Sequence, residues 1–136
     1  MIDEGHTIGN HSVHHYSMPT LDINTCRKEI TEEHDYIKEK FNYEMYLFRP
    51  PMGEFSEQSL AITQSCGYKT VLWSYAYADW NPDRQMEPSK ALSKITEAVH
   101  PGAIYLLHSV SKTNCEILGE FIDNVKALGY EFSATL

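Results

Sequence analysis

Histidine is concentrated near the start of the chain. The segment GHTIGNHSVHH, residues 5–15, contains His6, His11, His14 and His15, which are four of the seven histidines in the protein. Imidazoles three or four residues apart can point at one cation, and neutral histidine binds zinc and similar divalent metals. The spacing therefore indicates a candidate metal site, although histidines in a solvated loop would show the same pattern.

Three more segments carry side chains that could take part in catalysis. Arg49 precedes two prolines, whose rigid turn can hold a backbone N–H towards a site, and a guanidinium there can bind a carboxylate through two parallel hydrogen bonds. Asp79 and Trp80 follow an apolar segment, where Asp79 could orient a histidine and Trp80 could line an apolar or sugar pocket. His108 ends the segment YLLH and is suited to acid–base chemistry near neutral pH. Each residue also has an ordinary structural explanation, in a turn, a helix cap or the core.

The order of elements predicts a sheet of parallel strands covered by helices. Strands are expected at 6–10, 45–48, 69–75, 103–107 and 130–136, and helices at 22–41, 56–65, 88–99 and 114–128. This alternation of apolar strands with helices is typical of α/β folds.

The candidate residues all follow expected strands. His11 and His15 come after the first strand, Arg49 after the second, Asp79 after the third and His108 after the fourth. Because the carboxyl ends of parallel strands meet at one edge, where sites in α/β folds are built, we expect these side chains around a single site.

Composition limits the class of protein. The 136 residues suit one domain spanning 1–136, and the net charge of −8 argues against a surface for nucleic acid. No apolar run approaches the ~20 residues that a membrane-spanning helix needs. Cys26, Cys66 and Cys115 are odd in number and widely spaced, so they are expected to be unpaired.

Four short segments, taken in order, resemble the motifs of one enzyme family. The motifs are those of the polysaccharide deacetylases of carbohydrate esterase family 4, the NodB-homology domain. The similar segments in this chain are HSVHH, RPPMG, YADW and LLH. The resemblance runs along almost the whole chain. The family's motif H-(S/T)-x-x-H implies that His11 and His15 are metal ligands and leaves His14 as a neighbour. The longer segments FRPPMGEFSEQSL, VLWSYAYADW and LLHSVSKTN resemble the branch with the muramic δ-lactam-forming de-N-acetylases of spore-forming bacteria.

The resemblance implies a fold and a reaction. The fold is an incomplete (β/α) barrel of the NodB-homology type, in which parallel strands alternate with helices. The reaction is hydrolysis of N-acetyl groups on amino sugars of peptidoglycan or a related polysaccharide. N-acetylmuramic acid is the expected substrate, and a divalent metal, zinc, is the expected cofactor. Trp80 and Leu106 would wall the pocket for the acetyl methyl group.

The resemblance also implies roles in the chemical step. His108 would protonate the leaving amine, and Asp79 would hydrogen-bond His108 and favour its charged form. The backbone N–H of Met52 would stabilise the oxyanion, and Arg49 would orient the catalytic base. The partner would be a glycan strand of peptidoglycan or another polysaccharide. The family is secreted or acts in the cell envelope, although this chain by itself does not indicate a location.

The family's first motif, T-F-D-D-G, has no counterpart in this chain. That motif supplies the base aspartate and the third metal ligand, whereas this chain begins MIDEGH, which matches the segment directly before the histidine motif. Asp3 does not replace it. The chain resembles a family member without its first strand and helix, so we expect weak metal binding and little activity from the chain alone. The strand edges exposed by such a gap would favour a homodimer.

Two other interpretations stay open at this point. One is a catalytically inactive glycan-binding module of the same fold, which would use Trp80 and the tyrosines as platforms for sugars. The other is an unrelated α/β protein with an incidental histidine cluster, in which His11 and His15 would lie far from His108.

Overall fold

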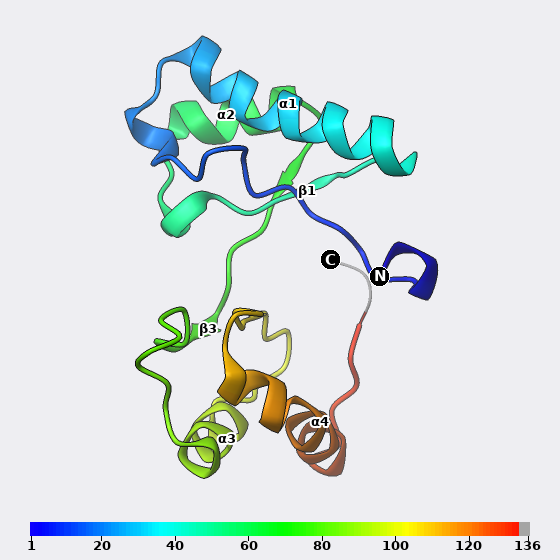
Figure 1. The fold of residues 1–136 in the computed structure, drawn as a ribbon, viewed down its shortest axis with the longest axis vertical. Coiled ribbons are helices and arrows are strands. Elements are labelled where there is room, and N and C mark those ends of the chain that lie inside the picture. The colour runs from blue at the N-terminus through cyan, green and yellow to red at the C-terminus, as the bar shows by residue number, and fades with distance from the viewer. Residues whose placement is uncertain (134–136) are drawn as a thin grey trace. The chain divides into compact units, whose positions relative to one another are not determined.

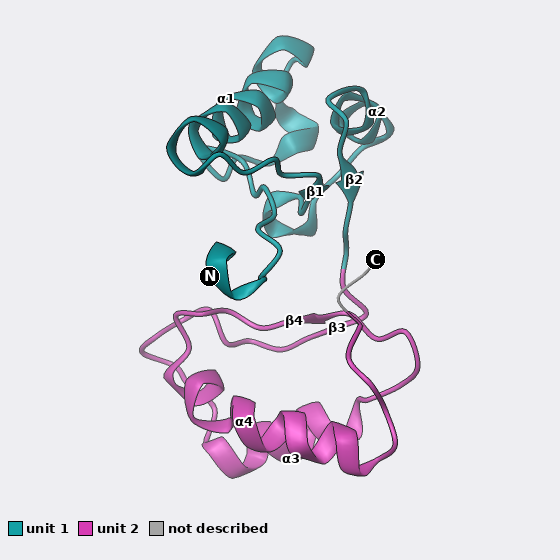
Figure 2. Cartoon of the chain, turned by 90° about the vertical axis from the view of Figure 1, so that its right-hand side faces the viewer, with its two compact units in different colours: residues 1–72 teal, residues 73–136 magenta. Residues whose placement is uncertain are grey.

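The chain forms two compact units, each with its own hydrophobic core. The structure is a computed structural model that describes residues 1–133. One unit, called unit 1, comprises residues 1–72, and the other, unit 2, comprises residues 73–136 (Figure 2). Whether both units belong to one domain, as the chain length predicts, stays a prediction.

Unit 1 contains two α-helices and a short parallel sheet (Figure 1). Its elements are the 3-10 helix η1 (Ile2–Glu4), η2 (Met18–Thr20), α1 (Ile23–Phe41), β1 (Leu47–Phe48), η3 (Pro51–Gly53), α2 (Glu57–Ser65) and β2 (Lys69–Thr70). Strands β1 and β2 are parallel, with Leu47 opposite Lys69. Asn10 adds an isolated parallel bridge to Phe48 on the other side of β1.

The two long helices of unit 1 begin where the sequence predicts. The side chain of Asp22 accepts hydrogen bonds from the backbone N–H groups of Asn24 and Thr25, which caps α1. Ser56 and Ser59 form a reciprocal capping box at the start of α2. These caps satisfy N–H groups that have no partner within a helix, so local sequence is enough to set the helix starts.

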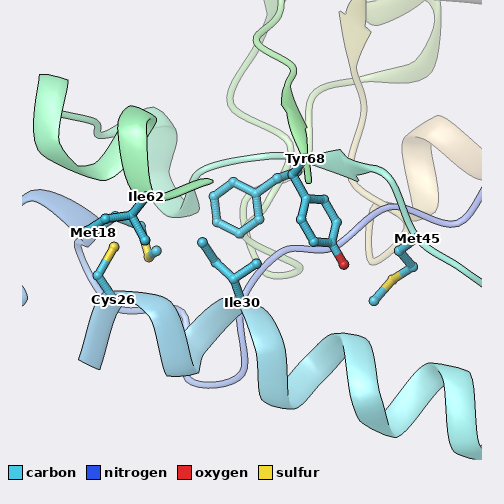
Figure 3. Close-up of a cluster of buried hydrophobic side chains, with 7 residues drawn as sticks. Met18, Cys26, Ile30, Met45, Ile62 and Tyr68 are labelled. Atoms are coloured by element: carbon cyan, nitrogen blue, oxygen red, sulfur yellow. The ribbon is translucent and has the colours of Figure 1, made fainter. Parts of the chain in front are cut away.

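The core of unit 1 lies between α1, α2 and the sheet (Figure 3). It consists of seven buried side chains, which are Met18, Cys26, Ile30, Met45, Phe48, Ile62 and Tyr68. The rings of Phe48 and Tyr68 meet edge to face, 6.3 Å between centroids. Cys26 is a buried free thiol within this core, and Cys66 and Cys115 also form no disulfide.

Unit 2 pairs two helices with a second short parallel sheet. Its elements are β3 (Tyr75–Ala76), α3 (Pro88–Glu97), β4 (Tyr105–Leu106) and α4 (Lys112–Ala127). Helices α3 and α4 lie side by side in both views (Figures 1 and 2). Their facing side chains form the second core, with Ala91 and Ile95 from α3 and Ile117, Phe121 and Val125 from α4.

The expected strand at 69–75 is wrong in its extent, because this segment is divided between the two sheets. The N–H groups of Lys69 and Val71 donate to the carbonyls of Tyr46 and Phe48 in unit 1. The N–H of Ser74 donates instead to the carbonyl of Ile104 in unit 2. The backbone changes its hydrogen-bonding partner within a few residues, so one β-rich run of sequence becomes two short strands.

Other expected elements also differ from the structure. The strands expected at 45–48 and 103–107 are limited to β1 and β4, and the helix expected at 88–99 ends at Glu97. The strand expected at 6–10 is reduced to the bridge at Asn10, and the helix expected from 114 begins at Lys112, since Ser111 accepts from the Asn114 N–H as its cap. Residues 130–133 form no strand, and 134–136 lie outside the described residues. The parallel strands and helices still form the expected α/β fold. No described helix is both long and apolar enough to cross a bilayer.

Candidate functional site

The histidine loop is anchored to unit 1 by Asn10. This residue is buried, and its side-chain amide donates to the carbonyl of Ile30 (2.8 Å), while its side-chain oxygen accepts from the N–H of Ser12 (2.9 Å). Ser12 and His15 have positive φ angles of 66° and 58°. Residues other than glycine rarely adopt this left-handed backbone conformation unless the surrounding structure holds them in it. The loop is therefore tightly folded rather than an open connection.

His11 and His15 lie next to each other, and the environment of His11 sets its tautomer. Nδ1 of His11 is 2.6 Å from the carbonyl oxygen of Arg49. A carbonyl only accepts, so Nδ1 carries the proton and the lone pair of the neutral ring is on Nε2, the arrangement common in metal-binding histidines. The ring of His15 meets that of His11 edge to face, with centroids 4.9 Å apart. The two neighbouring rings are ligands of the kind that a divalent cation takes.

His14 is held separately, by a residue that sequence reasoning missed. The buried carboxylate of Glu29 accepts from the backbone N–H of His14 (2.8 Å) and pairs with its Nδ1 (2.7 Å). Glu29 belongs to α1 and lies three residues after Cys26 and one before Ile30, both in the core. A carboxylate on the apolar face of a helix was the available sequence signal, because such a charge needs a partner.

The histidine pair offers only part of a metal site. Within residues 1–133, no group of three or more His, Cys, Asp or Glu side chains is placed to hold a metal ion. Catalytic zinc sites usually have three protein ligands. The two imidazoles therefore fit a divalent cation in kind but not in number.

The turn after β1 brings Arg49 and Met52 into the same region of unit 1. The N–H of Arg49 donates to the carbonyl of Asn10 (3.0 Å), which ties it to the histidine loop. The turn is closed by the N–H of Gly53, which donates to the carbonyl of Pro50 (3.1 Å). Met52 has a positive φ of 58°, so its backbone orientation is defined by the turn rather than by a helix.

The guanidinium of Arg49 is half-buried, and burial lowers the pKa of this group because it disfavours the charged form. In the part of the chain that the structure describes, Arg49 forms no ion pair. A partly buried cation of this kind is stabilised by a carboxylate, as the predicted role of Arg49 beside a catalytic base requires.

Unit 2 contains a buried Asp–His pair at the carboxyl ends of its strands. Asp79 is fully buried, and its carboxylate accepts from the backbone N–H of His108 (2.7 Å) and lies 2.6 Å from Nδ1 of that ring. The side-chain amide of Asn114, at the start of α4, donates to the same carboxylate (2.6 Å). The hydrogen bond that the sequence predicted is present, whereas the contribution of Asn114 was missed.

Trp80 and Leu106 lie near this pair. The indole of Trp80 is 58% exposed and meets the ring of His108 edge to face, 6.3 Å between centroids. Leu106 is half-buried at the end of β4, two residues before His108. The imidazole of His108 is itself partly exposed, with 31% of its side-chain surface accessible.

The candidate residues form two groups. His11, His15, Arg49 and Met52 belong to unit 1, and they are linked through Asn10 and the turn after β1. Asp79, Trp80, Leu106 and His108 belong to unit 2. The structure brings the members of each group together, and the meeting of both groups at one site stays a prediction.

Known proteins resemble this chain along nearly its whole length. Peptidoglycan-N-acetylmuramic acid deacetylase PdaA of Bacillus subtilis is 40% identical over 135 residues, which cover 98% of this chain and 51% of that protein. An uncharacterized 30.6 kDa protein of Geobacillus stearothermophilus is 41% identical over 135 residues, with the same coverage. The chain thus spans about half the length of these curated relatives.

Solved structures agree with the sequence relatives. The structure of Bacillus subtilis PdaA, a family 4 carbohydrate esterase, matches with a TM-score of 0.92 at 40% identity, covering 98% of this chain and 57% of that one. A family 4 pseudoenzyme from Bacillus anthracis matches with a TM-score of 0.87 at 28% identity, covering 96% of this chain and 45% of that one. The family model for polysaccharide deacetylase matches residues 1–71, which is more than half of this chain. The chain therefore belongs to the polysaccharide deacetylase family.

Proposed function

We propose that this chain belongs to a metal-dependent hydrolase that removes N-acetyl groups from amino sugars of peptidoglycan, with N-acetylmuramic acid as its substrate. The buried Asp79 that orients His108 is the observation that carries this proposal. A fully buried carboxylate on a partly exposed imidazole is an arrangement suited to acid–base catalysis, because it fixes the orientation of the ring.

His108 is the proposed general acid. Its Nδ1 donates to Asp79, so Nε2 is the nitrogen left to exchange a proton with the substrate. That proton goes to the nitrogen of the scissile amide as it leaves as an amine. The neighbouring indole of Trp80 and the side chain of Leu106 are the proposed walls for the acetyl methyl group.

His11 and His15 are the proposed metal ligands in this chain. When bound, a divalent cation such as zinc supplies Lewis-acid polarisation of the carbonyl and a more acidic water. The hydrogen bond from His11 Nδ1 to the carbonyl of Arg49 orients the ring. It leaves Nε2 as the nitrogen whose lone pair would coordinate the metal. The third ligand that such sites need is expected from a segment equivalent to the family's first motif.

Met52 and Arg49 are the proposed supports for the reacting atoms. The turn at Pro51–Gly53 holds the backbone of Met52 in a defined orientation, which is what an oxyanion donor requires. Arg49 is tethered to the histidine loop through Asn10, and its half-buried guanidinium is suited to orient a carboxylate base.

The substrate is proposed from the relatives of this chain. PdaA is named for N-acetylmuramic acid in peptidoglycan, and the Listeria monocytogenes relative PgdA for N-acetylglucosamine in peptidoglycan. PdaA is 40% identical to this chain and PgdA is 25% identical, which favours muramic acid.

The test is a chimaera in which this chain is preceded by the upstream segment of Bacillus subtilis PdaA that corresponds to the family's first motif. We expect the chimaera to release acetate from N-acetylated peptidoglycan strands in the presence of zinc, and His108→Ala to abolish that release. His100→Ala removes an exposed histidine of the same unit and serves as the matched control. A folded, zinc-binding chimaera that releases no acetate contradicts the proposal.

A second candidate is a glycan-binding module without activity. Two observations favour it: residues 1–133 hold no three-ligand metal group, and one similar structure is described as a pseudoenzyme. The chimaera separates the two candidates, since a binding module would bind glycan strands without releasing acetate. The third possibility, an unrelated α/β protein, is excluded by the family membership of the chain.

A further inference from the structure

A pocket next to the Asp79–His108 pair shares Trp80 with the scheme above, but its other lining residues have no role in that scheme. It has a volume of about 420 Å³ and opens between β3 and α3. Its lining residues are Ala78, Trp80, Asn81, Arg84, Gln85 and Met86. The pocket therefore combines one large aromatic face, one permanent cation and a few small or neutral side chains.

The loop that forms this pocket is held by hydrogen bonds rather than left open. The side-chain amide of Gln85 donates to the carbonyls of Asp79 (3.1 Å) and Asn81 (2.6 Å). Its side-chain oxygen accepts from the hydroxyl of Ser111 (2.5 Å), the cap of α4. The N–H of Arg84 donates to the carbonyl of Asn81 (3.1 Å). The backbone position of Arg84 is thus tied to the segment that carries Asp79.

The pocket is close to the proton-transferring residue. Trp80 lines the pocket and also contacts the ring of His108, 6.3 Å between centroids. The same Gln85 that lines the pocket binds the backbone of Asp79, the partner of His108. The pocket therefore shares Trp80 and Gln85 with the surroundings of the Asp79–His108 pair.

Arg84 is a cation without a partner in the part of the chain that the structure describes. No ion pair or side-chain hydrogen bond involves its guanidinium, although the exposed Asp83 is its sequence neighbour. It is the only arginine after residue 49, in a chain of net charge −8. An unpaired guanidinium beside an exposed indole can bind a carboxylate while the indole stacks on a sugar ring.

We propose that Arg84 is a specificity-determining residue that binds the carboxylate of the lactyl ether on muramic acid. This inference rests on the proposed function. In muramic acid the lactyl ether is on the sugar carbon next to the one that carries the acetamido group, so both groups lie on one edge of the ring. Glucosamine has a hydroxyl at that position. Arg84 therefore distinguishes the two sugars by charge while His108 faces the amide that they share.

The experiment measures binding, so it does not depend on the activity of this chain. The probes are the methyl glycosides of N-acetylmuramic acid, of its lactyl carboxamide and of N-acetylglucosamine, titrated into the full chain and followed by NMR. We expect the free acid to bind roughly tenfold or more tightly than the other two, because a charge-assisted hydrogen bond is lost in each. The preference should weaken as salt is raised, since both charges are exposed to solvent.

Variants identify the residue responsible. Arg84→Gln should remove the preference for the acid and leave the affinity for N-acetylglucosamine unchanged, whereas Arg84→Lys should retain part of it. Lys94→Gln removes an equal charge from the exposed face of α3 outside the pocket and should have no effect. Signals of Trp80 should shift with every probe that binds.

Each contrary result has a distinct meaning. Equal binding of the acid and N-acetylglucosamine, or a preference that survives Arg84→Gln, overturns the inference and leaves the proposed function standing. Failure of all three sugars to bind overturns the inference, whereas the proposed function is decided separately by acetate release from the chimaera. The last probe is an N-acetylmuramoyl dipeptide, in which the lactyl carboxylate is converted to an amide by its bond to the peptide. If it binds through Arg84 while the free acid does not, the carboxylate recognised is that of a peptide and the lactyl assignment is wrong.

Discussion

The carboxylate of Glu29 contacts His14 at two points, through the backbone N–H at 2.8 Å and through Nδ1 at 2.7 Å. Glu29 is buried in α1, whereas His14 belongs to the loop that carries His11 and His15. A helix residue thereby fixes the loop at its centre, and Asn10 fixes it at its start. The position of the proposed metal ligands depends on this contact although Glu29 is not itself a proposed ligand.

Glu29→Gln should destabilise the chain. The amide replaces an acceptor that takes two hydrogen bonds from His14, and leaving one buried polar group unsatisfied costs about 1–3 kcal/mol. Urea unfolding at neutral pH measures the loss. Glu32→Gln, on the exposed face of the same helix, is the control and should change the free energy of unfolding little. A loss equal in both variants would show that the contact is not specific.

The contribution of Glu29 to stability should depend on pH. Burial raises the pKa of this carboxyl, but the hydrogen bonds from His14 outweigh burial, and the net pKa is lowered from the ordinary value of 4.5. A lowered folded-state pKa means stability that is complete above pH 4.5 and is lost as the pH falls through the folded value. The difference in unfolding free energy between the wild type and Glu29→Gln should therefore shrink below that pH. A difference that grows on acidification contradicts this.

Asp79→Asn should release the ring of His108. The carboxylate accepts three hydrogen bonds in a fully buried site, and an asparagine presents an N–H₂ group to some of the same donors. We expect a loss of about 1–3 kcal/mol in stability. Proton–nitrogen correlation spectra should show Nδ1–H of His108 in the wild type and its loss in the variant. In the active chimaera the rate should fall about 10²–10⁴-fold.

Asp83→Asn is the control for that experiment. Asp83 is exposed, and only its backbone N–H takes part in the turn, through the side chain of Asn81. The variant should leave the His108 spectrum and the stability unchanged. An unchanged His108 tautomer in Asp79→Asn would refute the orienting role of the carboxylate.

Zinc should bind this chain weakly, through His11 and His15. Two imidazoles are fewer than the three protein ligands of usual catalytic zinc sites. In a zinc titration followed by NMR, the ring signals of these two residues should shift before those of other histidines. His11→Ala and His15→Ala should each remove the response, and His14→Ala should keep it if the loop stays folded. Tight binding of one zinc per chain by calorimetry would contradict the expectation.

The chain should associate with itself as its concentration rises. Within residues 1–133 each sheet has only two strands, and the outer edge of β1 is already bridged by Asn10, so the edges left for a second chain include those of the sheet in unit 2, β3 and β4. Light scattering across a concentration series should show a mass above that of the 15.6 kDa monomer. A monomeric mass throughout the series would count against a homodimer.

Some features of the fold follow from short stretches of sequence. Asp22 and Ser56 start α1 and α2, and Pro88 starts α3, as the sequence predicts. The fourth helix begins two residues earlier than expected, because Ser111 is its cap. These features depend on groups within one helical turn of each other, so no distant contact is needed to predict them.

The strands were predicted less well. Segment 69–75 has the composition of one strand, but its N–H groups donate first to unit 1 and then to unit 2. A strand is defined by the partner that its backbone bonds to, and the partner lies far away in sequence. Composition therefore located β-structure here without fixing where each strand ends.

The sequence by itself determined the family motifs, the starts of α1, α2 and α3, and the positions of Arg49, Asp79 and His108 downstream of short apolar strands. Only the tertiary structure decided which groups hold these residues, namely Glu29 for the histidine loop and Asn114 and Gln85 for the segment with Asp79. Motifs and caps are local, so residue type and spacing reveal them. Hydrogen-bond partners that come from other elements depend on how helices and strands pack, and spacing along the chain carries no record of that packing.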